Sequence, residues 1–259
     1  KSRYLARRER LGLGGTDRPD LTANDIPAAT RGFWALSENV GSTPLHKLPA
    51  PYLYPASSLA GTDVTMTLPR HFRRLEVSCE LAGVIGPRPI FRPMSEDIPD
   101  LLLGFGIIIS VIDMSLVDSF PGVRTAGMER FATYQCRYPD GCSPIGAIIP
   151  IAGGSAELAD AAMTLRVGET NRAQGRVGDY GVLVEEAVAW ITAGVTLLPG
   201  DVVSLGPSGA AVTIAAEEAL AAGTTLAATI EGIGEIEIPL VDRRDLSTEP
   251  WPWPLVPRT

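Results

Sequence analysis

The stretch LEVSCELAGVIG, residues 75–86, decides the fold of this chain. Its apolar and β-favouring residues continue as far as Gly86, which is typical of one long β-strand. Side chains two residues apart on a strand point to the same face, so Glu76, Ser78 and Glu80 share one side. That side therefore combines a carboxylate at residue 80 with a neutral hydroxyl at residue 78.

Shorter segments of the same character recur on both sides of this stretch, between turn signals. Helix signals are fewer: the acidic residues after Ser95 predict a helix start within residues 95–105, and the apolar spacing in residues 179–192 predicts an amphipathic helix. We therefore expect an α+β, strand-rich domain. The predicted strands are residues 64–68, 75–85, 103–112, 147–151, 163–167, 202–205, 212–214, 225–230 and 235–241.

Composition and charge argue against several classes of protein. The net charge of −8 disfavours nucleic acid as the main partner, because phosphate binding needs a basic surface. No apolar run approaches the ~18 residues of a transmembrane helix, so we expect no membrane partner. The chain has three cysteines, a small and uneven number that does not suit a disulfide scaffold and is typical of reduced thiols. These features predict a cytoplasmic protein whose main partner is neither nucleic acid nor a membrane.

The character of the chain changes near residue 50. Residues 1–50 are polar and rich in Pro and Gly, which predicts an N-terminal arm or cap. Residues 51–245 hold the predicted strands and are expected to form the catalytic domain, and residues 246–259 form a C-terminal tail. The basic start of the arm predicts a solvated segment, or else one that packs across a dimer partner.

Six blocks of sequence, in order, resemble the fumarylacetoacetate hydrolase family, which includes the acylpyruvate hydrolases. The resemblance spans about residues 51–241. The blocks are PYLYPASSLAG (51–61), CELAGVIG (79–86), GFGIIISVIDMSLVD (104–118), RYPDGCSPIGAIIP (137–150), LLPGDVVSLGPSG (197–209) and IEGIGEIEIPLV (230–241).

This resemblance implies a mixed β-sandwich roll, a homodimer, and Mg²⁺ held by three carboxylates. It also implies a His–Glu pair on a lid that activates water for C–C bond cleavage. Of the three carboxylates, the resemblance leaves two, Glu80 and Asp113, because Ser78 stands where the third belongs. Together they would bind Mg²⁺ weakly or not at all. Alternatively, one of them, buried without a metal, would have a raised pKa suited to proton transfer, or both would be locally hydrogen-bonded polar residues.

Other positions also depart from the family's pattern. Tyr54 and Arg137 stand where the family has lysines, and Arg137 is suited to clamping a carboxylate or enolate. The lid pair has no clear match, although His46 or Glu38 could replace its base. The candidate catalytic residues are Glu80, Asp113 and Arg137, and the candidate substrate-binding residues are Tyr54, Ser78, Gln174 and Gly206.

Three functions remain open from the sequence. The favoured hypothesis is an enzyme repurposed for a non-hydrolytic reaction, namely cyclisation, isomerisation, dehydration or decarboxylation. Its substrate would be polyketide-like or a β-dicarbonyl, in bacterial secondary metabolism. The second hypothesis is a Mg²⁺-dependent hydrolase of C–C bonds in acylpyruvates or diketones. The third is a non-catalytic binding protein.

Overall fold

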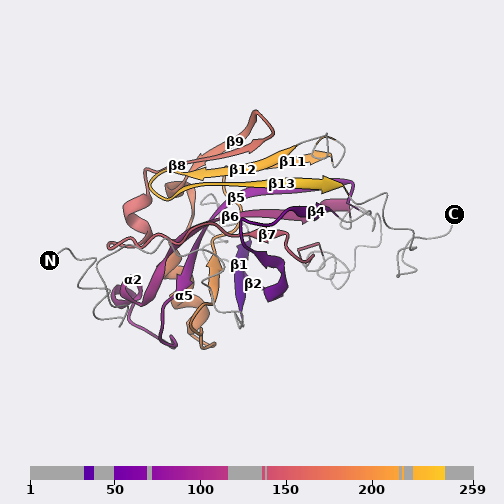
Figure 1. The fold of residues 1–259 in the computed structure, drawn as a ribbon. Helices are drawn as coiled ribbons and strands as arrows, with labels where there is room; N and C mark the ends of the chain where they lie inside the picture. Colours follow the sequence, from indigo (N-terminus) through magenta and orange to yellow (C-terminus); the bar gives the residue numbers. More distant parts are fainter. Residues whose placement is uncertain are drawn as a thin grey trace.

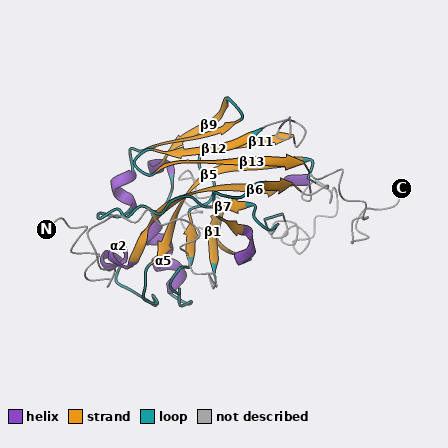
Figure 2. Ribbon diagram, in the orientation of Figure 1, coloured by secondary structure: helices purple, strands orange, loops and turns teal. Residues whose placement is uncertain are grey.

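The computed structural model of the chain describes residues 32–37, 50–68, 72–115, 136–137, 139–215, 218 and 224–242. Strands dominate and helices are few, so the α+β, strand-rich fold expected from the sequence is confirmed (Figure 2). Within the described residues no helix is both long and apolar enough to cross a membrane. The elements are β1 (Phe33–Ser37), β2 (Ala50–Tyr54), η2 (Ala56–Ser58), β3 (Leu59–Ala60), β4 (Met66–Leu68), β5 (Arg74–Ile85), η3 (Ser95–Asp97), α2 (Ile98–Leu101), β6 (Leu102–Asp113), β7 (Ser143–Pro144), η4 (Ser155–Leu158), β8 (Ala162–Val167), β9 (Thr170–Arg176), η5 (Val177–Asp179), α5 (Val184–Thr192), β10 (Val202–Ser204), β11 (Ala211–Ala215), β12 (Thr225–Ile230) and β13 (Gly234–Asp242).

The larger sheet is built around β5. Its strand order is β11-β5-β10-β1-β2, and β6 pairs with the other edge of β5 in a long antiparallel ladder. The smaller sheet has the order β4-β13-β12-β8-β9. In Figure 1 the strands β12 and β13 run across β5 and β6, and α2 and α5 lie near one end of those long strands.

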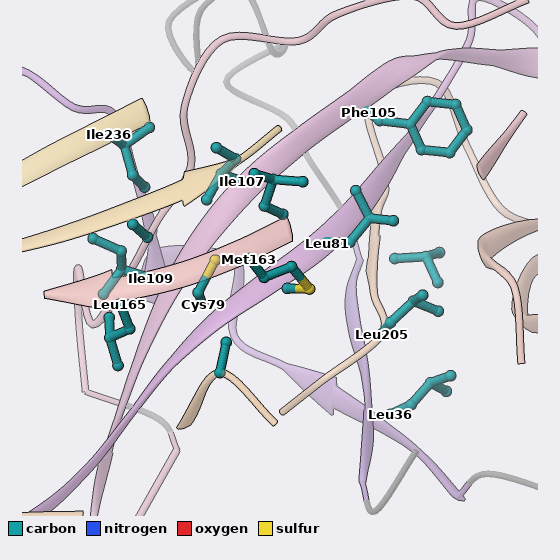
Figure 3. Close-up of a cluster of buried hydrophobic side chains, with 14 of the residues drawn as sticks. Leu36, Cys79, Leu81, Phe105, Ile107, Ile109, Met163, Leu165, Leu205 and Ile236 are labelled. Atoms are coloured by element: carbon teal, nitrogen blue, oxygen red, sulfur yellow. The ribbon is translucent and has the colours of Figure 1, made fainter. Parts of the chain in front are cut away.

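The main core fills the space between the two sheets. The side of β5 that carries Val77, Cys79 and Leu81 is buried there and is called the core face. Figure 3 shows Cys79 and Leu81 of β5 gathered with Ile107 and Ile109 of β6 and with side chains of the smaller sheet such as Met163. The opposite side of β5, which carries Glu76, Ser78 and Glu80, is called the site face.

A smaller apolar cluster lies apart from this main core. It includes Ala82, Ile108, Ile145, Ile148 and Val202, all of them buried. Ala82 and Ile108 follow the same strand alternation as Glu80, so this cluster covers part of the site face. The site face is therefore apolar along one stretch of β5 and polar along the next.

The edge of β5 beside Glu80 is interrupted by a bulge. Both β10 and β11 pair with this edge, but the register of β11 is shifted by three residues relative to that of β10. The extra residues belong to the turn around Gly206, whose φ of 74° lies in the left-handed region. A Cβ at Gly206 would lie 1.8 Å from the carbonyl oxygen of Leu36, so glycine is the residue that fits this turn.

Several sequence predictions need correction. The boundary expected at residue 50 does not separate two units, because β1 pairs with β10 in the larger sheet. Residues 147–151 form isolated bridges rather than a strand, and the helix expected over residues 179–192 is the shorter α5, Val184–Thr192. Most of the expected arm and the expected tail, residues 246–259, lie outside the described residues.

Candidate active site

Glu80 lies at the centre of the site face and is almost fully buried, with 2% of its surface exposed. Strand β5 places it there because the two-residue period puts Glu80 on the face opposite the main core. Its direct partner across the ladder is Ile108, so one neighbour of the carboxyl group is apolar. A carboxyl group in such a place needs hydrogen-bond partners, since an unpaired buried charge is very costly.

Two serine hydroxyls supply those partners. Ser78 Oγ donates to Glu80 Oε1 at 2.7 Å, and Ser204 Oγ donates to Glu80 Oε2 at 2.5 Å. Ser110 of β6 lies directly opposite Ser78 in the ladder and is also buried. Hydroxyl side chains, rather than further carboxylates, therefore surround Glu80.

Arg137 supplies positive charge to the same site. Its guanidinium carbon lies 5.5 Å from the ring centre of Tyr52, and its Nη1 donates to the sulfur of Cys136 at 3.3 Å. Tyr54, two residues along β2 from Tyr52, is buried and is close enough to Arg137 for a hydrogen bond between their side chains. Arg137 thus has an aromatic face on one side and a thiol on another.

Burial controls the protonation of these groups. Desolvation raises the pKa of Glu80, while the hydrogen bonds from Ser204 and Ser78 and the charge of Arg137 act in the opposite direction. Burial also raises the pKa of Tyr54, and raises that of the Cys136 thiol to about 11. Tyr54 and Cys136 therefore keep their protons at neutral pH. At a given pH, Glu80 is protonated to a greater extent than an exposed glutamate.

Asp113 is not paired with Glu80, in contrast to the expectation, although its backbone N–H donates to the carbonyl oxygen of Cys136 at 2.9 Å. The register places Asp113 opposite Leu75, whose side chain points to the core face, five residues along β5 from Glu80. At ~3.3 Å per residue this is a separation of about 16 Å along the strand. Asp113 Oδ1 instead accepts the backbone N–H of Ser115 at 2.9 Å. The residue that faces Ser78 across β6 is Ser110.

Of the two remaining predicted site residues, one lies beside Glu80 and the other does not. Gly206 lies beside Glu80, because its backbone N–H donates to Ser204 Oγ at 3.1 Å. Gln174 lies on β9 in the smaller sheet and its side chain is exposed, so the structure does not bring it to Glu80. His46 and Glu38, the alternatives for a lid base, lie outside the described residues.

The described residues do not fit a Mg²⁺ site built by Glu80 and Asp113. Both oxygens of Glu80 accept serine hydroxyls, and Asp113 lies on the other face of the sheet. Mg²⁺ prefers octahedral oxygen ligands anchored by one or two carboxylates that reach the same point. In the part of the chain that the structure describes, no group of three or more His, Cys, Asp or Glu side chains is placed to hold a metal ion.

Comparison with known proteins identifies the family. The family model described as "Fumarylacetoacetate (FAA) hydrolase C-terminal" matches residues 27–241, which is most of the chain. The chain belongs to the fumarylacetoacetate hydrolase family. The match begins before β1, which agrees with the place of β1 in the larger sheet. The family takes its name from a hydrolase, and a relative of this chain is a tautomerase, so the family is one of enzymes.

The similar proteins are distant in sequence. An uncharacterised protein of Pyrococcus horikoshii is 29% identical over 226 residues, covering 84% of this chain and 88% of that protein. A mitochondrial oxaloacetate tautomerase of Oryza sativa subsp. japonica is 25% identical over 223 residues, covering 83% of this chain and 88% of that protein. The crystal structure of 2-hydroxyhepta-2,4-diene-1,7-dioate isomerase from Mycobacterium marinum superposes with a TM-score of 0.66 at 24% identity. The match covers 82% of this chain and 75% of that one. The structural likeness shows the fold alone.

Four residues of the site, Tyr52, Ser110, Cys136 and Ser204, were not predicted from the sequence. Tyr52 carries a usable signal, since it lies two residues from the predicted site residue Tyr54 and shares its face wherever the segment is extended, as it is in β2. Ser204 and Cys136 carry no such signal. Both reach the site only through strand pairing and loop placement that the local sequence does not specify.

Proposed function

We propose that this chain catalyses a non-hydrolytic proton transfer on an anionic β-dicarbonyl substrate, with Glu80 as the general acid and base. The observation that carries the proposal is the environment of Glu80: a buried carboxyl group held by Ser78 and Ser204 rather than by a carboxylate cluster. Among the four reactions predicted from the sequence, isomerisation fits best, because it requires one group that gives and takes a proton.

Each neighbouring group has a role in such a reaction. The guanidinium of Arg137 would bind the anionic end of the substrate and stabilise the enolate that forms when a proton leaves carbon. The hydroxyl of Tyr54, which keeps its proton, would donate a hydrogen bond to a substrate oxygen. The apolar cluster around Ile108 would limit the access of water, which disfavours hydrolysis of the intermediate.

The comparisons support this proposal without deciding the reaction. The tautomerase of Oryza sativa acts on a dicarbonyl acid by its name, and a tautomerase reaction is a proton transfer. Hydrolysis of a C–C bond assisted by Mg²⁺ is the second candidate, since the family also includes hydrolases such as the maleylpyruvate hydrolase of Sphingobium. The setting in secondary metabolism and the homodimer stay predictions.

Two probes test the proposal in one experiment. Oxaloacetate and 2,4-dioxopentanoate would be followed by the ultraviolet absorbance of the enol and by NMR for C–C cleavage products, with and without EDTA. We expect accelerated keto–enol interconversion that is insensitive to EDTA, without cleavage. Glu80→Gln should lower the rate at least 100-fold, because general acid–base groups contribute about 10²–10⁴.

The matched control is Glu96→Gln, which changes an exposed glutamate. It should leave both rates unchanged. Cleavage that is abolished by EDTA and restored by Mg²⁺ would establish the hydrolase instead. If neither probe nor any related dicarbonyl is turned over by the wild type, the binding-protein hypothesis is favoured.

A further inference from the structure

The hydrogen bond from Ser204 determines whether Glu80 Oε2 acts as a donor or as an acceptor. Ser204 Oγ accepts the backbone N–H of Gly206 at 3.1 Å and lies 2.5 Å from Glu80 Oε2. The Ser204 hydroxyl donates to Glu80 Oε2, and among the described residues its hydrogen has no second acceptor in hydrogen-bond range. Glu80 Oε2 is therefore the acceptor in this hydrogen bond.

The Gly206 turn that holds Ser204 is itself held in place. Its left-handed φ of 74° and the close approach to Leu36 restrict the turn. The carbonyl oxygen of Gly206 accepts the hydroxyl of Tyr180 at 3.0 Å, and that hydroxyl also accepts the N–H of Leu81 at 3.3 Å. Tyr180 belongs to the main core, so the turn is hydrogen-bonded to a core residue.

The second oxygen of Glu80 faces a hydroxyl with more freedom. Ser78 Oγ lies 2.7 Å from Glu80 Oε1, and a serine hydroxyl can rotate to donate or to accept. When Glu80 is neutral, Oε2 is already an acceptor, so the carboxyl proton belongs on Oε1 and is directed at Ser78.

Ser78 also lies on the way from Glu80 to solvent. Along the site face, Ser78 lies between Glu80 and the half-buried Glu76, whereas Ser204 pairs with Ala82 on the other side of Glu80; both serines are themselves fully buried. The charge of Arg137 acts on both Glu76 and Glu80, which places the guanidinium near the stretch that Ser78 occupies. A substrate anion bound by Arg137 would approach Glu80 from the side of Ser78.

We propose that Glu80 exchanges its proton from Oε1 through the hydroxyl of Ser78, and that Ser204 is a positioning residue that keeps Oε2 as an acceptor. This inference rests on the proposed function. In the forward step the Oε1–H bond of Glu80 breaks as a new O–H bond forms on Ser78, and the former Ser78 hydrogen passes to a substrate oxygen. Glu80, now a carboxylate, regains a proton from the substrate carbon: the C–H bond breaks as its proton passes to Ser78 Oγ and the Ser78 hydrogen passes to Oε1, which leaves the enol and restores both groups without an oxidant or reductant.

The two serines should behave differently when each is replaced. Ser78→Ala should lower kcat for keto–enol interconversion at least 100-fold with little change in KM, and Ser78→Thr, which keeps a hydroxyl, should recover at least part of that loss. Ser204→Ala should lower kcat less than tenfold. A proton inventory in H₂O–D₂O mixtures should be curved for the wild type and linear for Ser78→Ala, because two hydrogens move in the first case and one in the second.

A second measurement needs no substrate. Infrared difference spectra against Glu80→Gln report the carbonyl stretch of neutral Glu80. With the proton on Oε1, the carbonyl oxygen is Oε2, so Ser204→Ala should move this band to higher frequency by more than Ser78→Ala does. Ser143→Ala, which changes a buried serine of β7, should not move it.

The outcomes separate this inference from the proposed function. If Glu80→Gln loses activity but Ser78→Ala keeps it within threefold, the proton does not pass through Ser78, and the proposed function stands. If Ser204→Ala loses as much activity as Ser78→Ala, or shows the smaller infrared shift, the assignment of the proton to Oε1 is overturned. If Glu80→Gln stays active, both proposals fail.

Discussion

Arg137 is constrained by its neighbours more than an ordinary half-buried arginine. Its guanidinium faces the ring of Tyr52 at 5.5 Å and donates to the sulfur of Cys136 at 3.3 Å. The raised pKa of the Cys136 thiol, about 11, keeps that sulfur neutral at physiological pH. A planar guanidinium satisfies a ring, a sulfur and an anion together, which an ammonium group does not.

The first prediction concerns this arginine. Arg137→Lys should raise KM for an anionic dicarbonyl such as 2,4-dioxopentanoate about tenfold, equivalent to about 1.4 kcal/mol of binding free energy. The reason is that lysine keeps the charge but loses the planar contacts. Steady-state kinetics at fixed pH provide the measurement, with Arg88→Lys, an exposed arginine, as the control. An unchanged KM would show that Arg137 does not bind the substrate anion.

At the scale of elements, the bulge between β10 and β11 builds the site. Strand β5 alone would bring Ser78 and Glu80 together, but the three-residue shift of register opens the turn that carries Gly206. Ser204, at the end of β10, reaches Glu80 because of this turn. Bulges commonly redirect side chains beside functional sites.

The second prediction tests the turn. Gly206→Ala should destabilise the protein by about 1–3 kcal/mol, because alanine resists a φ of 74° and its Cβ would meet the backbone of Leu36. Chemical denaturation followed by circular dichroism measures the free energy of unfolding. Gly194→Ala is the matched control, since nothing lies within 4 Å of the added Cβ, and it should change stability by less than about 1 kcal/mol. Equal stability of the two variants would mean that the turn is not restricted.

Element by element, the sequence predicted strands better than their register. The long apolar runs of residues 75–85 and 103–112 predicted β5 and β6 almost to their ends, because each run is longer than an apolar stretch expected by chance. The pairing between them depends on long-range contacts, and it alone shows that Ser110, not Asp113, faces Ser78. The short strand β1 was missed because five residues within a polar segment carry too little periodicity.

At the scale of the whole molecule, the raised pKa of Glu80 links stability to pH. The folded protein keeps the Glu80 proton at pH values where the unfolded chain, with an ordinary value near 4.5, has lost it. The unfolded state then binds fewer protons, so the free energy of unfolding falls as pH rises from about 4.5 to the folded pKa. Above the folded pKa this contribution no longer changes.

The third prediction follows from this fall in the free energy of unfolding with rising pH. Between pH 4.5 and the folded pKa, the wild type should lose about 1.4 kcal/mol of stability per pH unit relative to Glu80→Gln, which has no proton to lose there. Urea unfolding at a series of pH values gives both curves. The charges of Arg137 and Glu76 act on Glu80 in the folded wild type and help to set its folded pKa, so their effect on Glu80 is part of the measured difference. Parallel curves would mean that Glu80 titrates normally.

Glu80 is a buried, proton-exchanging carboxyl group with a raised pKa rather than a metal ligand. Infrared difference spectroscopy between the wild type and Glu80→Gln over a series of pH values, in EDTA and then in Mg²⁺, measures this directly. We expect a carboxylic acid carbonyl band in the wild type that is absent from Glu80→Gln, persists to higher pH than the band of an exposed glutamate, and is unchanged by Mg²⁺. A band that is lost at the pH of an ordinary glutamate, or that disappears as Mg²⁺ binds, would show that Glu80 titrates normally or binds the metal.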